Sequence, residues 1–69
     1  MKCLFNERIK ELRLEKKLNQ KSFADRLGVK QSCISKWERA ETLPDAEMII
    51  QIVEFFNISA DYLLGIKDY

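Results

Sequence analysis

The 69-residue chain contains no histidine and only two cysteines, Cys3 and Cys33. Without histidine the chain lacks the commonest general base, and its serines have no partner that would activate them as nucleophiles. The spacing of the two cysteines fits neither a zinc site nor a disulfide framework. These absences argue against an enzyme and against a bound metal or cofactor. We expect reduced thiols, with a redox sensor at Cys33 as the alternative.

Glycine and proline are also scarce, with two and one residues, and the sequence has no run of 18 apolar residues. The first observation argues against disorder, and the second argues against a membrane span. The apolar start is interrupted at Asn6 by polar and charged side chains, too early for a secretory signal. We therefore expect a cytoplasmic protein. A chain of this length forms one domain, over residues 1–69, and helical packing is its economical way to bury a core.

Residues 19–39 predict two short helices joined by a tight turn. Phe23, Ala24 and Leu27 share one face of the first helix, and Asn19 precedes them as a side-chain acceptor for the first free N–H groups. Gly28 follows, a residue that ends a helix in the left-handed conformation without steric cost. The second helix therefore begins only a few residues after the first one ends.

The second helix of this pair has a polar face that packing does not explain. Ile34 and Trp37 form its apolar inner face. Once they are buried, four hydrogen-bonding side chains point outward: Gln31, Ser32, Ser35 and Lys36. This row predicts a binding surface.

Three further helices complete the expected chain. An apolar stripe predicts a first helix over about residues 6–17, with Asn6 as its N-cap and Arg8 on the solvent face. Another helix should begin with Pro44 in its first turn, where proline is favoured. A short last helix spans residues 60–64. Its ends are set by a capping serine and a terminal glycine.

The net charge of +1 hides an asymmetry along the chain. Residues 1–40 carry eleven Lys or Arg and five Asp or Glu, net +6, whereas residues 41–69 carry one Lys and six acids, net −5. A basic half is typical of a protein that presents one face to a polyanion. Random variation of surface charge is the equally weighted alternative.

Several motifs resemble the Cro/Xre helix-turn-helix family, to which lambda-type repressors also belong. They are Leu18-Asn19-Gln20, Ala24 five residues before Val29, Leu27-Gly28-Val29, the segment 31–38, Leu43-Pro44-Asp45, the segment 56–59 and the segment 61–65. The resemblance covers nearly the whole chain. It implies an all-α fold, a compact five-helix lambda-repressor-like DNA-binding domain whose second and third helices form the helix-turn-helix. It also implies a transcriptional regulator of prokaryotic or phage origin, associated with the nucleoid and most often a repressor.

The resemblance assigns roles to individual residues. Bases of double-stranded DNA would be read by Gln31, Ser32, Ser35 and Lys36, because a helix fits the major groove and these side chains match base edges. Phosphates would be contacted by Arg13, Gln20, Lys21, Lys30 and Arg39. Structural support would come from Glu38, Trp37 and Gly28. In the family the arginine at position 13 pairs with the glutamate at position 38, and the glutamine at position 20 braces Gln31.

The sequence departs from the family at both ends of the recognition helix. Lys30 replaces the usual capping Ser or Thr, which costs about 1 kcal/mol and makes sense beside a phosphate. Ala40 replaces the usual glycine. Either the helix runs on past Arg39, or Ala40 adopts a left-handed conformation at a cost of about 1 kcal/mol; both alternatives leave the course of residues 41–42 open.

One small domain touches few bases, so we expect a two-fold dimer with recognition helices about 34 Å apart. Surplus apolar side chains are the candidates for its interface: Met48, Ile50, Phe55, Tyr62, Ile66 and Tyr69. Two alternatives remain. The chain is either a protein-binding adaptor resembling an antitoxin, or the DNA-binding half of a larger ligand-sensing regulator.

Overall fold

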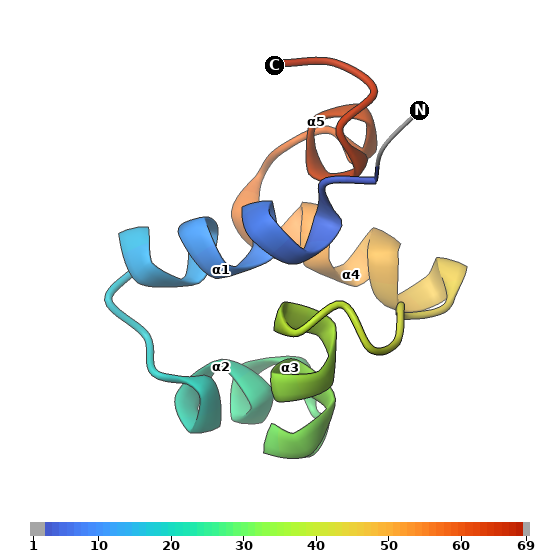
Figure 1. Cartoon of the computed structure of the whole chain (residues 1–69). Helices are drawn as coiled ribbons and strands as arrows, with labels where there is room; N and C mark the ends of the chain where they lie inside the picture. The colour runs from blue at the N-terminus through green and yellow to red at the C-terminus, as the bar shows by residue number, and fades with distance from the viewer. Residues whose placement is uncertain (1–2, 69) are drawn as a thin grey trace.

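The computed structural model describes residues 3–68 and, over that range, consists of five α-helices. They are α1 (Phe5–Glu15), α2 (Gln20–Leu27), α3 (Gln31–Glu38), α4 (Ala46–Phe56) and α5 (Ala60–Leu64). Figure 1 shows α2 and α3 at one end of the molecule and α5 at the opposite end, with α1 and α4 between them. Helix α3 packs against α1 and α2, and α5 packs against α1 and α4. The all-α, five-helix prediction is confirmed.

All five helices contribute to one apolar core. Six side chains in it are fully buried: Phe5, Ile9, Phe23, Ile34, Ile52 and Leu63. Burying one such side chain stabilises the fold by about 1.5 to 3 kcal/mol. The core therefore fixes how α3 is oriented relative to α1 and α2. No helix within residues 3–68 has the length and apolar character needed to cross a lipid bilayer.

Side-chain caps set the amino ends of three helices. Asn19 accepts a hydrogen bond from the Ser22 N–H at 2.7 Å, and Asp45 accepts one from the Met48 N–H at 2.9 Å. Ser59 caps α5 in the same way. These bonds satisfy N–H groups that have no partner within the helix. The prediction that Pro44 lies in the first turn of α4 is wrong, because Asp45 is the cap and the helix begins at Ala46.

The predicted bounds of the first helix are also wrong. Helix α1 begins at Phe5, so Asn6 lies inside it, and the residue before the helix, Leu4, makes no side-chain cap. Instead, the Leu4 N–H donates to the Leu64 carbonyl oxygen at 3.1 Å, which ties the start of α1 to α5. The helix ends at Glu15, and Lys17 adopts a left-handed conformation with φ of +58°. The start of α1 is thus held by a residue sixty positions away in the sequence, which local sequence patterns do not indicate.

Arg8 does not face solvent, contrary to expectation. Its guanidinium lies over the Tyr62 ring, 4.3 Å from the ring centre, and donates to the carbonyl oxygens of Tyr62 and Lys67, the latter at 2.9 Å. A charged hydrogen bond and a cation–π contact both favour this position. Arg8 thereby fastens the segment after α5 onto α1.

Candidate nucleic-acid interface

The turn between α2 and α3 depends on Gly28. This glycine has φ of +75°, and its N–H group donates to the Asp25 carbonyl oxygen at 3.3 Å. The next N–H, from Val29, returns to the Ala24 carbonyl oxygen at 3.0 Å. A Cβ at position 28 would meet no atom within 4 Å, so the constraint at this position is backbone conformation rather than space. The predicted supporting role of Gly28 rests on this left-handed turn.

The inner face of α3 is anchored in the core. Ile34 is fully buried and Trp37 is 5% exposed. The Trp37 ring meets the Phe5 ring of α1 edge to face, with centroids 6.1 Å apart. Such edge-to-face packing adds about 0.5 to 1.5 kcal/mol to the burial itself. Helix α3 is thus held rigidly, which a surface that reads another molecule requires.

The outer face of α3 is polar, as predicted. Gln31, Ser32 and Lys36 are exposed, and Ser35 is half-buried. Lys30 directly precedes them and is exposed, with an extended backbone and no side-chain cap. Its positive charge therefore stands at the amino end of α3, where an anion is stabilised by the helix dipole and by free N–H groups.

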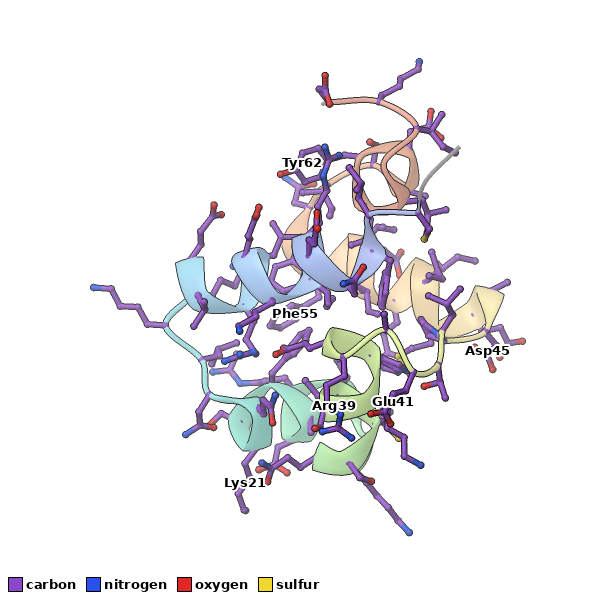
Figure 2. All side chains as sticks on the ribbon, viewed as in Figure 1. Lys21, Arg39, Glu41, Asp45, Phe55 and Tyr62 are labelled. Atoms are coloured by element: carbon purple, nitrogen blue, oxygen red, sulfur yellow. The ribbon has the colours of Figure 1, made fainter. Side chains whose placement is uncertain are left out.

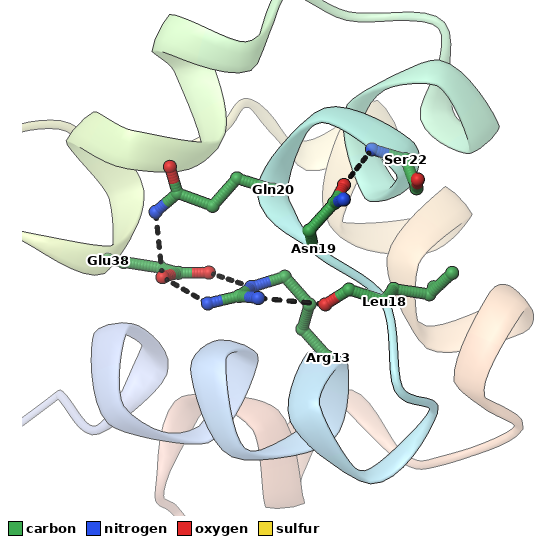
Figure 3. Close-up of polar contacts among 6 residues, drawn as sticks. All are labelled: Arg13, Leu18, Asn19, Gln20, Ser22 and Glu38. Carbon is green, nitrogen blue, oxygen red and sulfur yellow. Dashed lines mark hydrogen bonds and ion pairs between the residues drawn. The ribbon is translucent and has the colours of Figure 1, made fainter.

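A buried polar cluster joins α1, α2 and α3 (Figure 3). The Arg13 guanidinium forms a two-pronged ion pair with Glu38, with Nε–Oε2 at 2.6 Å and Nη2–Oε1 at 3.0 Å. Its Nη1 donates to the Leu18 carbonyl oxygen at 2.8 Å, and Gln20 Nε2 donates to Glu38 Oε1 at 3.1 Å. The two charged side chains are only 8% and 5% exposed. The expected Arg13–Glu38 pair is therefore present.

This cluster bears on two expectations. Arg13 is buried and directs three of its N–H groups at Glu38 and Leu18, so it supports the fold, and the expectation that it also contacts a phosphate stays a prediction. Gln20 bonds Glu38 and not Gln31. Since an amide nitrogen carries two hydrogens, Gln20 keeps one N–H for another partner. Gln20 of α2 therefore contacts α3 at Glu38 rather than at Gln31.

A second polar cluster lies at the carboxyl end of α3, and the sequence did not reveal it. Arg39 Nε meets Glu41 Oε2 at 2.6 Å, Arg39 Nη2 meets Glu41 Oε1 at 3.3 Å, and Arg39 Nη1 donates to Ser35 Oγ. The hydrogen bond from Arg39 holds the pKa of Glu41 below its usual value and that of Arg39 above it. Two predicted DNA contacts, Ser35 and Arg39, are thus bound to each other, and Arg39 is also paired with Glu41.

The remaining basic candidate, Lys21, is a surface residue. Its ammonium lies 3.9 Å from Asp25, and both side chains are more than 70% exposed. Exposed pairs of this kind contribute at most about 1 kcal/mol and exchange readily. Lys21 is therefore accessible to an anion.

Two of the apolar side chains predicted for a dimer interface, Phe55 and Tyr62, have aromatic or cationic partners in their own chain. Phe55 packs against Phe23 and Phe56, with ring centroids 5.9 and 5.0 Å away, and Lys16 covers its ring. Tyr62 lies under Arg8. Figure 2 labels both aromatic residues. Both side chains therefore already take part in contacts that stabilise the fold.

The other interface candidates differ in exposure. Met48 is half-buried, whereas Ile50 and Ile66 are 57% and 49% exposed. Tyr69 lies outside the described residues. Both cysteines are free thiols, and within residues 3–68 no three potential metal ligands come together.

Two helices joined by a left-handed glycine turn, with the second helix anchored inward and polar outward, define a helix-turn-helix domain. The chain belongs to the Cro/Xre and lambda-repressor-like helix-turn-helix family, whose family model matches residues 9–63. This family comprises DNA-binding transcriptional regulators, which are not enzymes, as the sequence predicted.

Curated relatives agree with this assignment. The transcriptional activator BcrR of Enterococcus faecalis is 40% identical over 61 residues, which are 88% of this chain and 30% of BcrR. The repressor protein C2 of Salmonella phage P22 is 38% identical over 61 residues, 88% of this chain and 28% of C2. The uncharacterized regulator YazB of Bacillus subtilis is 37% identical over 60 residues, 87% of each chain. The chain thus spans less than a third of BcrR and of C2.

Solved structures share the fold. The P22 c2 repressor in complex with a synthetic operator has a TM-score of 0.81 at 37% identity, covering 87% of this chain and 91% of that one. A transcriptional regulator from Listeria innocua has a TM-score of 0.89 at 29% identity, covering 94% and 61%. The lambda-repressor-like architecture predicted from the sequence is confirmed.

Proposed function

We propose that this chain binds double-stranded DNA sequence-specifically and regulates transcription, with α3 in the major groove. One observation carries the proposal: a helix locked to α1 and α2 from the inside presents Gln31, Ser32 and Lys36 to solvent. Gln31 can pair bidentately with adenine, Ser32 can meet a donor or an acceptor, and Lys36 can donate to guanine. The likeness to a repressor whose solved structure includes its operator supports the same use of α3.

Phosphate contacts would come from side chains that flank this helix. Lys30 stands at the amino end of α3 and Lys21 on the surface of α2, both exposed. Gln20 has a second N–H group to offer beside its bond to Glu38. Contacts of this kind position a protein on the duplex without reading its sequence.

We infer a repressor of phage or mobile-element type, acting in the cytoplasm at the nucleoid. The likeness to a phage repressor supports this sign of regulation. A two-fold dimer on DNA, with Met48, Ile50 and Ile66 at its interface, would double the number of bases read. The exposure of Ile50 and Ile66 supports their choice.

The proposal is tested by separating base reading from phosphate binding. Selection from a random pool first defines the preferred duplex, and binding of the parent is then measured against salt. Gln31→Ala should lose about 1 to 3 kcal/mol of preference at one base pair, because one bidentate contact disappears. Lys30→Ala should weaken all duplexes alike and lower the salt slope by about 1, because one phosphate contact disappears.

Glu11→Gln, an exposed change on α1, is the control and should bind as the parent does. If the parent shows no salt-dependent duplex binding, or if both α3 variants bind every duplex as it does, the proposal is wrong.

A further inference from the structure

An acidic residue, Glu41, follows the carboxyl end of α3, where a positive charge would favour binding to DNA. Glu41 takes the Nε and Nη2 donors of Arg39 on its two carboxylate oxygens, at 2.6 and 3.3 Å, and Ser35 takes Nη1. Figure 2 labels Arg39 and Glu41 beside each other at α3. The ion pair is about half exposed, with side-chain exposures of 56% and 50%, so it lies on the surface.

The backbone brings Glu41 to this place. Ala40 adopts φ of +60°, its N–H donates to the Trp37 carbonyl oxygen at 3.1 Å, and the Glu41 N–H returns to the Lys36 carbonyl oxygen at 2.9 Å. This pair of bonds is a Schellman motif, which reverses the chain at a helix end. Because two backbone bonds set the turn, residue 41 is held directly after α3, within reach of the Arg39 guanidinium.

Glu41 occupies the part of Arg39 that a phosphate would need. Arginine binds carboxylates and phosphates through the same planar fork of N–H donors. With that fork on Glu41 and the remaining arm on Ser35, the Arg39–Glu41 pair is electrically neutral toward a DNA backbone. A neutral pair releases no counterion from DNA and adds nothing to sequence-independent affinity.

We propose that Glu41 withholds Arg39 from the DNA backbone and so limits the sequence-independent share of the binding affinity. This inference rests on the proposed function. Arg39 then acts as a positioning residue that holds Ser35, and the earlier expectation that it contacts phosphate is replaced. Gln31 and Ser32, the proposed base contacts at the amino end of α3, take no part in the Arg39–Glu41 ion pair.

Two variants separate a withheld arginine from one that already contacts phosphate. Glu41→Gln keeps the side-chain shape but removes the charge, so Arg39 is released for phosphate. We expect the affinity for both the selected duplex and a random one to rise about five- to tenfold at 0.1 M salt, and the salt slope to steepen by about 0.9.

The double variant Glu41→Gln/Arg39→Gln again presents a neutral pair. It should bind both duplexes within about twofold of the parent, with the parent's salt slope. If Arg39 contacts phosphate in the parent, this double variant binds about five- to tenfold more weakly with a shallower slope, and the inference is overturned. It is also overturned if Glu41→Gln leaves affinity unchanged, or if it weakens binding to the selected duplex, which would make Glu41 a base reader.

Asp61→Asn is the matched control. It removes one negative charge and breaks an exposed ion pair, Asp61–Lys67 at 3.9 Å, on α5 at the end of the molecule opposite α3 (Figure 1). We expect less than a twofold change in affinity and no change in slope, and an increase equal to that of Glu41→Gln would mean that net charge alone is responsible. Parent binding with a steep salt slope checks the proposed function separately, so failure of the variants alone contradicts only the inference.

The Arg39–Glu41 ion pair can also be measured without DNA. In the parent, the Arg39 Nε–H should give a distinct NMR signal shifted by its hydrogen bond, and Glu41→Gln should move it toward the position of an unbonded guanidinium. If the Arg39 Nε–H signal of the parent already lies at the position of an unbonded guanidinium, the Arg39–Glu41 ion pair does not form in solution and the inference is wrong.

Discussion

At the scale of single residues, three non-glycine positions within residues 3–68 adopt a left-handed backbone: Lys17, Ala40 and Asn57. Asparagine tolerates this conformation, whereas alanine is strained by its Cβ. Of the two alternatives that the sequence left open at Ala40, the left-handed one is therefore correct. This steric strain lies in the turn that brings Glu41 beside Arg39.

Ala40→Gly should relieve that strain and raise the free energy of unfolding by about 1 kcal/mol, because glycine has no Cβ to clash at positive φ. Urea denaturation measures the change. Val29→Gly, in the half-buried residue after the α2–α3 turn, should instead destabilise the fold, since its φ is not positive and packing is lost. A loss of stability on Ala40→Gly would contradict the assigned strain.

At the scale of secondary-structure elements, the Arg13–Glu38–Gln20 cluster fastens α1, α2 and α3 together. A buried ion pair is costly to break from one side, because the remaining charge loses its partner without regaining water. The position of α3, and with it the exposed face of Gln31, Ser32 and Lys36, therefore depends on this buried cluster as well as on the apolar core.

Glu38→Ala should cost about 3 to 5 kcal/mol, since it leaves the Arg13 charge buried and unpaired. A chain of this size has a total stability of about 3 to 10 kcal/mol, so the variant should lose a third or more of it. Thermal and urea unfolding measure the loss. Arg13→Met/Glu38→Leu, which removes both charges, should recover most of it, and equal loss in the single and double variants would contradict this account.

Capping residues and apolar patterns predicted the helices from the sequence, but they did not predict contacts between segments far apart in the chain. Asn19 marks the start of α2 through its side-chain cap and Gly28 marks the end through its left-handed backbone, and the structure places both as expected. Arg8 looked like a solvated charge because its partners, Tyr62 and Lys67, lie more than fifty residues away. Glu41 was missed because its position depends on a left-handed alanine, which sequence patterns do not favour.

At the scale of the whole molecule, the basic and acidic parts of the chain form different helices. The first 40 residues, which carry net charge +6, include α1, α2 and α3. The exposed apolar residues Ile50 and Ile66 lie in the later, acidic part. The charge asymmetry thus agrees with one face for a polyanion and another for a second protein surface.

If the exposed apolar side chains join two copies on DNA, Ile66→Asp should weaken binding to two half-sites centred about 34 Å apart. We expect a five- to tenfold loss, or about 1 to 1.4 kcal/mol, because a charge would be buried at the interface. Binding to a single half-site is the control and should not change. Gel shifts on the two duplexes measure both values, and equal weakening on both would place Ile66 outside the interface.

The hydrogen bond between Leu4 and Leu64, reinforced by Arg8, ties the start of α1 to α5, and α5 lies at the pole of the molecule opposite α3 (Figure 1). A fluorophore, a surface anchor or a fused protein attached at that pole would therefore stand clear of the recognition helix. The domain can be immobilised or joined to other cargo there while α3 remains open to a duplex.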